Sequence, residues 1–236
     1  MNFSMRKILR FGLSLIALAL FFNAFAVSEA KAQQINEFLK RKEAYRVRVT
    51  SLESNLMMIK YDPVIKKSDV TQGALKYAAE RDKKGTDVGA AIRIDWVKPE
   101  ETLSVVKGKY VLYRPRLNVY YTGKADSKNA KDKGGDALKF MNMSKKELQA
   151  NYSVQYLGEE KLDGTAVFHL QLTPKTASNY QNADVWIDVN GAIHQFKVTA
   201  KSGDYTAFRL TNIKENPKFP GSVFVVNTNG AKRIEG

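Results

Sequence analysis

The chain contains no cysteine and only two histidines, and both shortages narrow what the protein can be. Without cysteine there are no disulfide bonds, so packing and backbone hydrogen bonds must supply the stability. A nucleophilic triad needs a histidine beside a serine or cysteine, and both His169 and His194 fall on the polar side of alternating segments. We interpret them as ordinary surface or edge residues.

Other catalytic signatures are missing as well. The acidic residues and histidines do not cluster at metal-ligand spacings, and neither GxxxxGK[ST] nor GxGxxG occurs. Asp184 and Asp188 share a strand face, but this spacing along a strand separates them by about 13 Å, too far to act on one bond. The sequence therefore argues against an enzyme and predicts no cofactor or metal.

Long apolar runs are confined to the start of the chain. Arg6, Lys7 and Arg10 precede an almost wholly apolar run over residues 11–27, and Ala30 and Ala32 supply small residues for a signal peptidase. No later run approaches the ~18 residues of a membrane-spanning helix. We expect residues 1–32 to be a cleaved signal peptide and residues 33–236 to form a single domain in an aqueous compartment outside the cytoplasm.

The chain has an excess of positive charge. Its net charge is +14, of which the leader contributes +3, so +11 remains after cleavage. That balance suits a negatively charged partner such as a phospholipid surface, an acidic protein or nucleic acid. The charges are spread along the chain, and export argues against nucleic acid.

Hydrophobic periodicity predicts one helix followed by many strands. Apolar residues at helical spacing indicate a helix over residues 34–54, although Lys42 interrupts its apolar face. Two short helices are expected at 137–141 and 145–151, the second opened by a capping box of Ser144 and Glu147. Residues 123–136 resemble a basic surface loop. Strands are predicted at 56–61, 74–77, 92–96, 103–106, 110–113, 117–121, 152–157, 165–173, 184–189, 193–201, 205–213 and 223–227.

Alternation within these strands predicts a sheet with one apolar face. Val185, Ile187 and Val189 alternate with Asp184 and Asp188, and the neighbouring strands show the same pattern. Such a sheet needs a cover on its apolar face, and the predicted helices are the segments available. We therefore expect a mainly β fold, an unclosed antiparallel β-barrel (half-barrel) covered by one long and two short helices.

Several segments together resemble the periplasmic outer-membrane lipoprotein carrier family, LolA. The resemblance runs in the same order over about residues 70–230. It rests on residues 92–100, 108–115, 170–175, 186–196 and 208–213, followed by Phe219 and Phe224.

The resemblance implies a half-barrel whose concave apolar surface holds the acyl chains of a lipoprotein between the inner and outer membranes. It implies acylated lipoproteins, an inner-membrane release complex and an outer-membrane acceptor as partners, the periplasm as location, and a monomer. Family members often carry an Arg-Pro pair that is thought to latch the lid. Here Arg81 is the nearest candidate, and no proline follows it.

We therefore expect an acyl-chain cavity closed by a helical lid. The expected cavity lining is Ile94, Trp96, Leu112, Phe168, Leu170, Ile187, Phe196 and Phe208, and the expected lid residues are Phe38, Leu39, Phe140 and Met141. The alternative for each residue is a closed core with no ligand. Two other functions stay open: an envelope lipid or lipoprotein sensor with the same fold, and a basic module for anionic polymers that uses Lys124 to Lys133.

Overall fold

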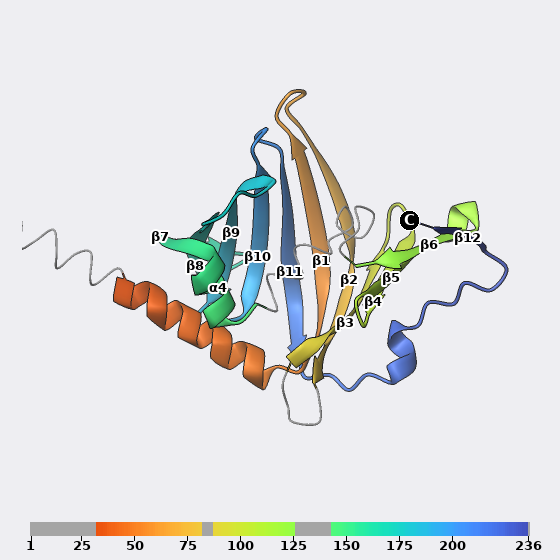
Figure 1. Cartoon of the computed structure of the whole chain (residues 1–236), viewed down its shortest axis with the longest axis horizontal. Helices are drawn as coiled ribbons and strands as arrows, with labels where there is room; N and C mark the ends of the chain where they lie inside the picture. The colour runs from red at the N-terminus through yellow and green to blue at the C-terminus, as the bar shows by residue number, and fades with distance from the viewer. Residues whose placement is uncertain (1–31, 82–86, 126–142, 236) are drawn as a thin grey trace, which may run out of the picture.

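The computed structural model describes residues 32–81, 87–125 and 143–235 (Figure 1). Twelve strands form one sheet in the order β12-β6-β5-β4-β3-β2-β1-β11-β10-β9-β8-β7. Every neighbouring pair is antiparallel except β12 and β6, which run parallel. Within the described ranges, the end strands β12 and β7 do not pair with each other, so the sheet is not closed.

The strand bounds follow the predicted pattern but extend it. The strands are β1 Ser51–Asp62, β2 Lys67–Arg81, β3 Asp87–Trp96, β4 Glu101–Val106, β5 Lys109–Arg114, β6 Val119–Lys124, β7 Tyr152–Leu162, β8 Thr165–Pro174, β9 Tyr180–Asp188, β10 Ile193–Ala200, β11 Tyr205–Glu215 and β12 Lys232–Glu235. The fold class predicted from the sequence, a mainly β half-barrel with a helical lid, is confirmed.

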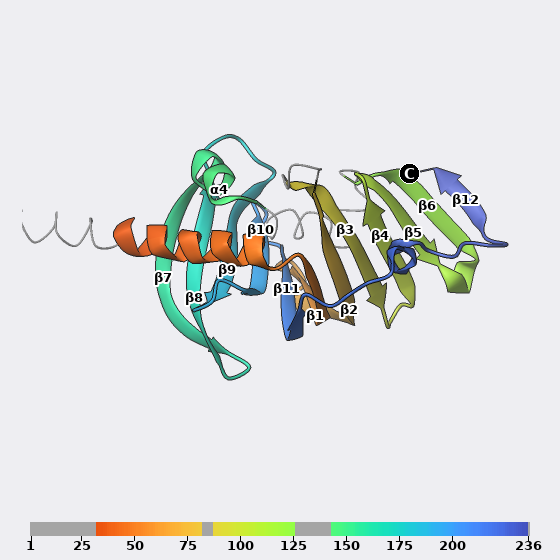
Figure 2. The ribbon, with the colours of Figure 1, turned by 90° about the horizontal axis from the view of Figure 1, so that it is seen from below.

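Two helices lie on one side of this sheet. The helix 32–48 runs across β7 to β10 (Figure 2), and α4 (Lys145–Asn151) lies beside it. The α4 capping box is confirmed, because the Ser144 hydroxyl accepts from the Glu147 amide and the Glu147 carboxylate accepts from the Ser144 amide. The short helix predicted at 137–141 and most of the basic loop predicted at 123–136 lie outside the described residues.

The predicted end of the long helix was wrong. We expected it to continue to residue 54, but it ends at residue 48, and β1 begins at Ser51. Val47 and Val49 have branched side chains that lower helix propensity, and Leu52 and Leu56 are buried from β1 instead. The predicted boundary was misplaced because the apolar residues at the start of β1 continue the helical spacing of the residues before them.

The strand predicted at 223–227 was also wrong. The 3₁₀ helix η2 (Gly221–Phe224) occupies its first part, and the C-terminal segment around it crosses the face of β3 and β4 that points away from helix 32–48. The Arg93 guanidinium donates to the Val223 carbonyl at 3.0 Å, and the Ser104 hydroxyl donates to the Phe224 carbonyl at 2.6 Å. These two side chains bind backbone carbonyls that would bond to a neighbouring strand if the segment were a strand. The chain then forms β12, which was not predicted.

Candidate functional site

One face of the sheet is mostly apolar, and we call it the concave face. Register pairs Tyr121 with Leu112, Leu112 with Leu103, Leu103 with Ile94 and Ile94 with Leu75 across five strands. In the other half of the sheet, on the same face, a second row joins Leu170, Val185, Phe196, Phe208 and Met58. Because partners in register project to the same side, both rows lie on one surface. They meet at β1 and β2, where Leu75 pairs with Ser54 and Met58 pairs with Thr71.

The sequence-predicted cavity residues all lie on this concave face. Seven are buried: Ile94, Trp96, Leu112, Leu170, Ile187, Phe196 and Phe208. Phe168 is half-buried and packs against the core. Val189, which we expected on the same apolar face as Ile187, is 59% exposed, because β9 ends at Asp188 and the chain turns there.

Helix 32–48 covers the concave face of β7 to β10. The Phe38 ring stacks on Phe168 with centroids 4.2 Å apart and lies 5.2 Å from the Tyr156 ring. Leu39 is buried against Leu148 of α4 and the aliphatic side chains of β8 and β9. Of the four expected lid residues, Phe38 and Leu39 therefore contact the sheet, and Phe140 and Met141 lie outside the described residues.

Little space remains between this helix and the sheet. A hollow of about 40 Å³ lies between helix residues Lys42, Tyr45 and Arg46 and the side chains of Leu52 and Tyr77. A second hollow of about 10 Å³ lies under Leu39. Since a single water needs roughly 10 to 15 Å³ measured in this way, these hollows hold a few waters and no acyl chain. The space between helix 32–48 and the sheet is therefore closed.

A larger hollow lies on the opposite, convex face. It measures about 390 Å³ and is lined by polar groups that include Asp188, His194, Arg209 and Glu215. The side chain of Arg209 reaches Asp163 of the β7–β8 turn at 3.6 Å and Gln195 at 2.8 Å. A polar lining of this kind does not suit an acyl chain, because its charged groups would lose water without gaining partners.

The sequence analysis missed the part that Lys42 plays. Its side chain is 4% exposed, faces both small hollows, and donates from Nζ to the Met143 carbonyl. Burial lowers the pKa of the Lys42 ammonium from 10.5 to about 8, and the nearby Glu43 only partly offsets this effect. One indication of this role was visible in the sequence, because Lys42 interrupts the apolar face of the predicted helix. A lysine at such a position is either solvated or buried with a partner.

Polar contacts attach the helix to the rest of the protein along its length. Glu43 binds Arg46 at 2.7 Å and also accepts from the Lys145 amide of α4 at 2.9 Å. The hydrogen bond from Arg46 lowers the pKa of the Glu43 carboxyl. At the C-terminal end, Arg81 Nη2 of β2 donates to the Val47 carbonyl at 2.9 Å. Arg81 thus binds a helix-end carbonyl, which is where a latch would act.

The β9–β10 turn lies directly against this helix. Gly191 has φ of +92°, and a Cβ at this position would collide with the Arg41 carbonyl and would lie 2.7 Å from the Lys42 amide nitrogen. Only glycine therefore fits here, both for its backbone angle and for its contact. The Arg41 side chain also donates to the Val189 carbonyl in the same turn at 3.4 Å.

A second charged pair lies at the other end of the concave face. Arg114 Nε of β5 lies 2.9 Å from Glu101 Oε1 of β4, and the Glu101 side chain is 7% exposed. The Arg114 guanidinium also lies over the Tyr121 ring, 5.0 Å from its centroid. Glu101 is the register partner of Trp96, so the residue beside Trp96 on the concave face of β4 is charged and not apolar.

The convex face of β7 to β10 carries a hydrogen-bonded network that the sequence analysis treated as solvent-exposed. His169 bonds to Glu160 at 2.7 Å and to Asp184 at 3.0 Å, and its ring stacks on Trp186 at 4.2 Å. Asp184 is 2% exposed and also binds Lys197 at 3.0 Å. The expectation that His169 is an ordinary surface residue was wrong.

Electrostatics of this network favour its charged forms. Burial alone raises the pKa of the Asp184 carboxyl, but hydrogen bonds from His169 and Lys197 outweigh burial, and the pKa lies below its ordinary value. Burial lowers the pKa of the His169 imidazole, but its bonds to Asp184 and Glu160 outweigh burial and raise it. Within the described ranges, no group of three or more His, Asp and Glu side chains is placed to hold a metal ion.

Solved structures of other proteins share this fold. A crystal structure of MucB is similar with a TM-score of 0.51 at 14% identity, covering 84% of this chain and 64% of that one. An uncharacterized conserved protein from Thermus thermophilus gives a TM-score of 0.53 at 9% identity, covering 86% and 99%. The Pseudomonas aeruginosa MucA/MucB complex gives 0.49 at 10%, covering 84% and 62%. This chain thus spans less than two thirds of the MucB chains.

At these identities the likeness establishes the fold alone. No curated protein matches the sequence, and no helix in the described part of the chain is long and apolar enough to cross a membrane. A family model described as "Outer membrane lipoprotein carrier protein LolA" matches residues 89–227, which is more than half of the chain. That segment begins in β3 and ends after η2, and so includes most of the apolar concave face. The chain therefore belongs to the LolA family of outer membrane lipoprotein carrier proteins.

Proposed function

We propose that this protein is a periplasmic carrier that binds the acyl chains of lipoproteins on its concave face and shuttles them from the inner to the outer membrane. The observation that supports it best is the apolar concave face, which runs in register across β6 to β2 and is covered over β7 to β10 by helix 32–48. Membership of the LolA family, whose proteins carry or bind rather than catalyse, supports the same function.

The energetic need for such a carrier is large. Burial of a methylene group is worth ~0.8 kcal/mol, so an acyl chain of about 15 methylenes gains on the order of 12 kcal/mol on leaving water. A lipoprotein with such chains does not cross an aqueous gap unaided. The carrier must present an apolar surface at the donor, shield it in water and present it again at the acceptor.

Loading beneath helix 32–48 requires this helix to move, because the hollows there are far smaller than an acyl chain. The contacts that would be lost are of two kinds. Phe38 and Leu39 would exchange protein contacts for contacts with the ligand, which keeps their surfaces out of water. The hydrogen bond between Arg81 and the Val47 carbonyl lies at an exposed position, where water replaces it. We propose that Arg81 acts as the lid latch.

The partners follow from the proposed cycle. The sequence contains no nucleotide-binding loop, so a donor complex in the inner membrane would supply the energy for loading, and an acceptor of higher affinity at the outer membrane would drive release. The positive charge of the chain would favour acidic partner faces or anionic headgroups.

Uptake of an acylated peptide by the purified protein tests this function, and variants of β8 test its location. Phe168→Glu places a carboxylate on the concave face under Phe38, and we expect it to abolish binding of a palmitoylated peptide, measured by fluorescence titration. Thr173→Glu is the matched control, because Thr173 lies on the same strand, is exposed and projects to the convex face.

Equal uptake by the two variants would contradict the proposed site, and no uptake by the wild type would contradict the carrier function. A sensor with the same fold is the second candidate. It would hold its ligand when mixed with membranes, whereas a carrier passes the peptide to a second acceptor.

A further inference from the structure

The turn between β1 and β2 stands out from the molecule as a projection, and we call residues 62–68 the β1–β2 tip. Pairing of β2 with β3 stops at Gly73 and Trp96, whereas β2 begins at Lys67. The hairpin therefore continues beyond β3 by the length of residues 67–72, roughly 20 Å at 3.3 Å per residue. Figure 1 shows it as the tallest point of the sheet.

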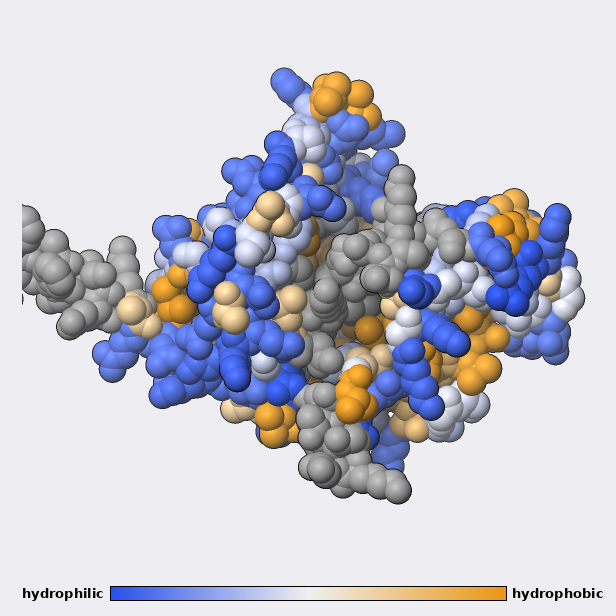
Figure 3. All heavy atoms as spheres, in the orientation of Figure 1, coloured by the Kyte–Doolittle hydropathy of each residue, from blue (hydrophilic) through white to orange (hydrophobic). Residues whose placement is uncertain are grey.

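Apolar side chains are exposed on this tip. Val64 is 88% exposed and Ile65 is 66% exposed, and Val70 on the adjoining part of β2 is 55% exposed. Figure 3 shows the cluster as orange spheres at the top of the molecule. Turns are usually built from Gly, Asn, Asp, Pro and Ser, so two neighbouring β-branched residues in this turn are not required by its geometry.

The structure holds these side chains in place. Asp62 Oδ1 accepts from the Val64 amide at 2.8 Å and from the Ile65 amide at 3.4 Å, which fixes the turn. Gly203 of the β10–β11 turn lies beside it, so close that a Cβ there would touch Pro63 at 3.7 Å. The tip is thus a supported, preorganised structure, and little conformational entropy is lost when it binds.

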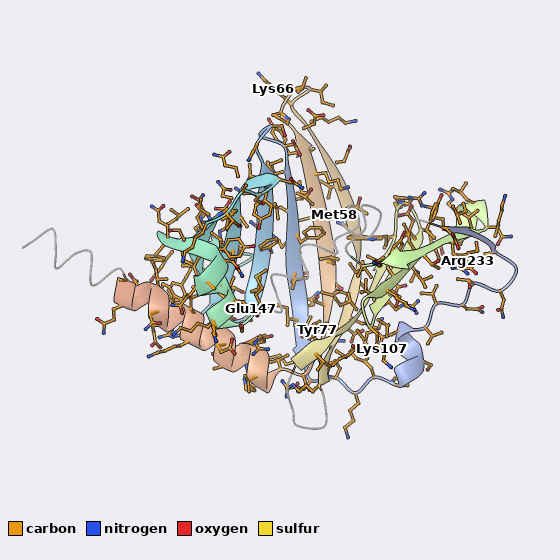
Figure 4. All side chains as sticks on the ribbon, viewed as in Figure 1. Met58, Lys66, Tyr77, Lys107, Glu147 and Arg233 are labelled. Atoms are coloured by element: carbon orange, nitrogen blue, oxygen red, sulfur yellow. The ribbon has the colours of Figure 1, made fainter. Side chains whose placement is uncertain are left out.

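Charged side chains and aromatic rings surround the apolar tip. Lys66 lies at its apex (Figure 4), and Lys67 and Lys201 lie nearby and are exposed, as are Asp69 and Asp204. Lys67 Nζ lies 3.9 Å from Asp69 Oδ1 in an exposed pair, which a lipid phosphate can replace at little cost. The Asp62 carboxylate is occupied by the amides of the turn. Below the tip, Tyr61 and Tyr205 stack with ring centroids 5.0 Å apart.

This order matches the layers of a membrane surface. Aliphatic side chains suit the acyl boundary, lysines suit phosphate groups, and tyrosines are enriched at the headgroup level. We propose that the β1–β2 tip docks the protein on an anionic phospholipid bilayer by inserting Val64 and Ile65 between the headgroups, with Lys66 and Lys67 bound to lipid phosphates. This docking is separate from acyl binding on the concave face.

Co-sedimentation with vesicles tests the docking. The wild-type protein is expected to bind vesicles made of equal parts phosphatidylglycerol and phosphatidylcholine and to bind phosphatidylcholine vesicles weakly. Val64→Ser combined with Ile65→Ser is expected to lower the partition coefficient at least about tenfold, which corresponds to about 1.4 kcal/mol. The matched control is Val97→Ser with Leu117→Ser, two residues that are 63% and 65% exposed elsewhere, and it is expected to bind like the wild type.

The lysines have a control of the same kind. Lys66→Gln with Lys67→Gln is expected to weaken binding and its dependence on salt, and Lys107→Gln, in the exposed β4–β5 turn, is expected to change neither. The proposal would be overturned if the wild type did not bind vesicles, or if the apolar variant and its control lost binding equally. It would also be overturned if the tip bound a protein partner and no vesicle.

Failure of the docking proposal and failure of the carrier proposal give different results. The tip variants are expected to take up palmitoylated peptide within about twofold of the wild type in the absence of vesicles, whereas Phe168→Glu is expected to lose uptake and still bind vesicles. Vesicle binding that disappears together with peptide uptake in Phe168→Glu would overturn the separation of the two surfaces.

Discussion

The two faces of the same sheet are stabilised in different ways. On β8, Leu170 projects to the concave face and packs among aliphatic side chains, whereas the preceding residue, His169, projects to the convex face and bonds to Glu160 and Asp184. Burial of apolar surface has no required geometry, so a flexible acyl chain can replace a lid residue. Hydrogen bonds have geometry, and a ligand cannot replace those of the network.

This difference indicates which parts of the molecule exchange and which stay fixed. The network of Glu160, His169, Asp184 and Lys197 joins four adjacent strands on the face away from the lid. In the proposed carrier cycle, the sheet would keep its curvature while helix 32–48 moves on the other side. Substitutions on each face separate the two kinds of stabilisation.

The largest effect is expected on the convex face. Asp184→Ala removes a buried carboxylate and leaves the Lys197 ammonium and the His169 imidazole without this partner. We expect the free energy of unfolding to fall by roughly 3 kcal/mol, measured by urea denaturation at neutral pH. Asp163→Asn is the control, because Asp163 is 56% exposed and lies 3.6 Å from Arg209, and asparagine tolerates its φ of +49°; a loss of less than about 0.5 kcal/mol is expected there. Similar losses in both variants would remove the distinction between network and surface pairs.

The second prediction concerns Lys42, the cation buried under the lid. Because burial lowers its pKa to about 8 in the folded protein, the unfolded chain binds more protons between pH 8 and 10.5. The wild type should therefore gain stability as the pH rises through this window, relative to Lys42→Met, by on the order of 3 kcal/mol. Urea denaturation of both proteins across the window measures the difference, from which other titrating groups cancel. Parallel pH profiles would mean that the Lys42 ammonium is not desolvated.

The smallest effect on stability is expected from Arg81→Ala. Loss of its hydrogen bond to the Val47 carbonyl should lower the free energy of unfolding by about 1 kcal/mol or less. Amide exchange should nevertheless rise in helix 32–48 and stay unchanged in β7 to β10, because the variant releases the lid and leaves the convex network intact. Arg116→Ala, in the exposed segment before β6, provides the control. Unchanged exchange in the helix would contradict a latch at Arg81.

Sequence patterns predicted the strands and the concave face because both depend on period-two alternation. Trp96, Leu170 and Phe208 were placed correctly on that face, since each belongs to an alternating segment. The pattern failed where a segment uses side chains instead of strand pairing. Residues 223–227 have high β propensity, but Arg93 and Ser104 bind their carbonyls from a distant part of the chain, and no local pattern records such a contact.

The charged parts of the site were harder to predict for the same reason. Lys42 was visible as an interruption, yet its partner, the Met143 carbonyl, lies about a hundred residues away. The His169 network was missed because alternation along a strand assigns polar residues to the solvent side. In the structure, His169 stacks on Trp186 and Asp184 is buried between neighbouring strands. Whether the concave residues bind acyl chains depends on lid movement, which is a property of competing states and not of residue type.

The glycine in the β9–β10 turn limits how the lid can travel. Because the helix backbone at Arg41 and Lys42 sits in the space that a side chain at Gly191 would fill, the turn acts as a stop against sliding along the helix axis. If the lid moves as proposed, we expect it to pivot or lift away from this point and not to shift by one helical step along the turn. Entry of a ligand is then expected from the side of the helix that swings outward. A crosslink between residues 41 and 189, which lie together at this contact, is expected to permit a pivot and block full detachment.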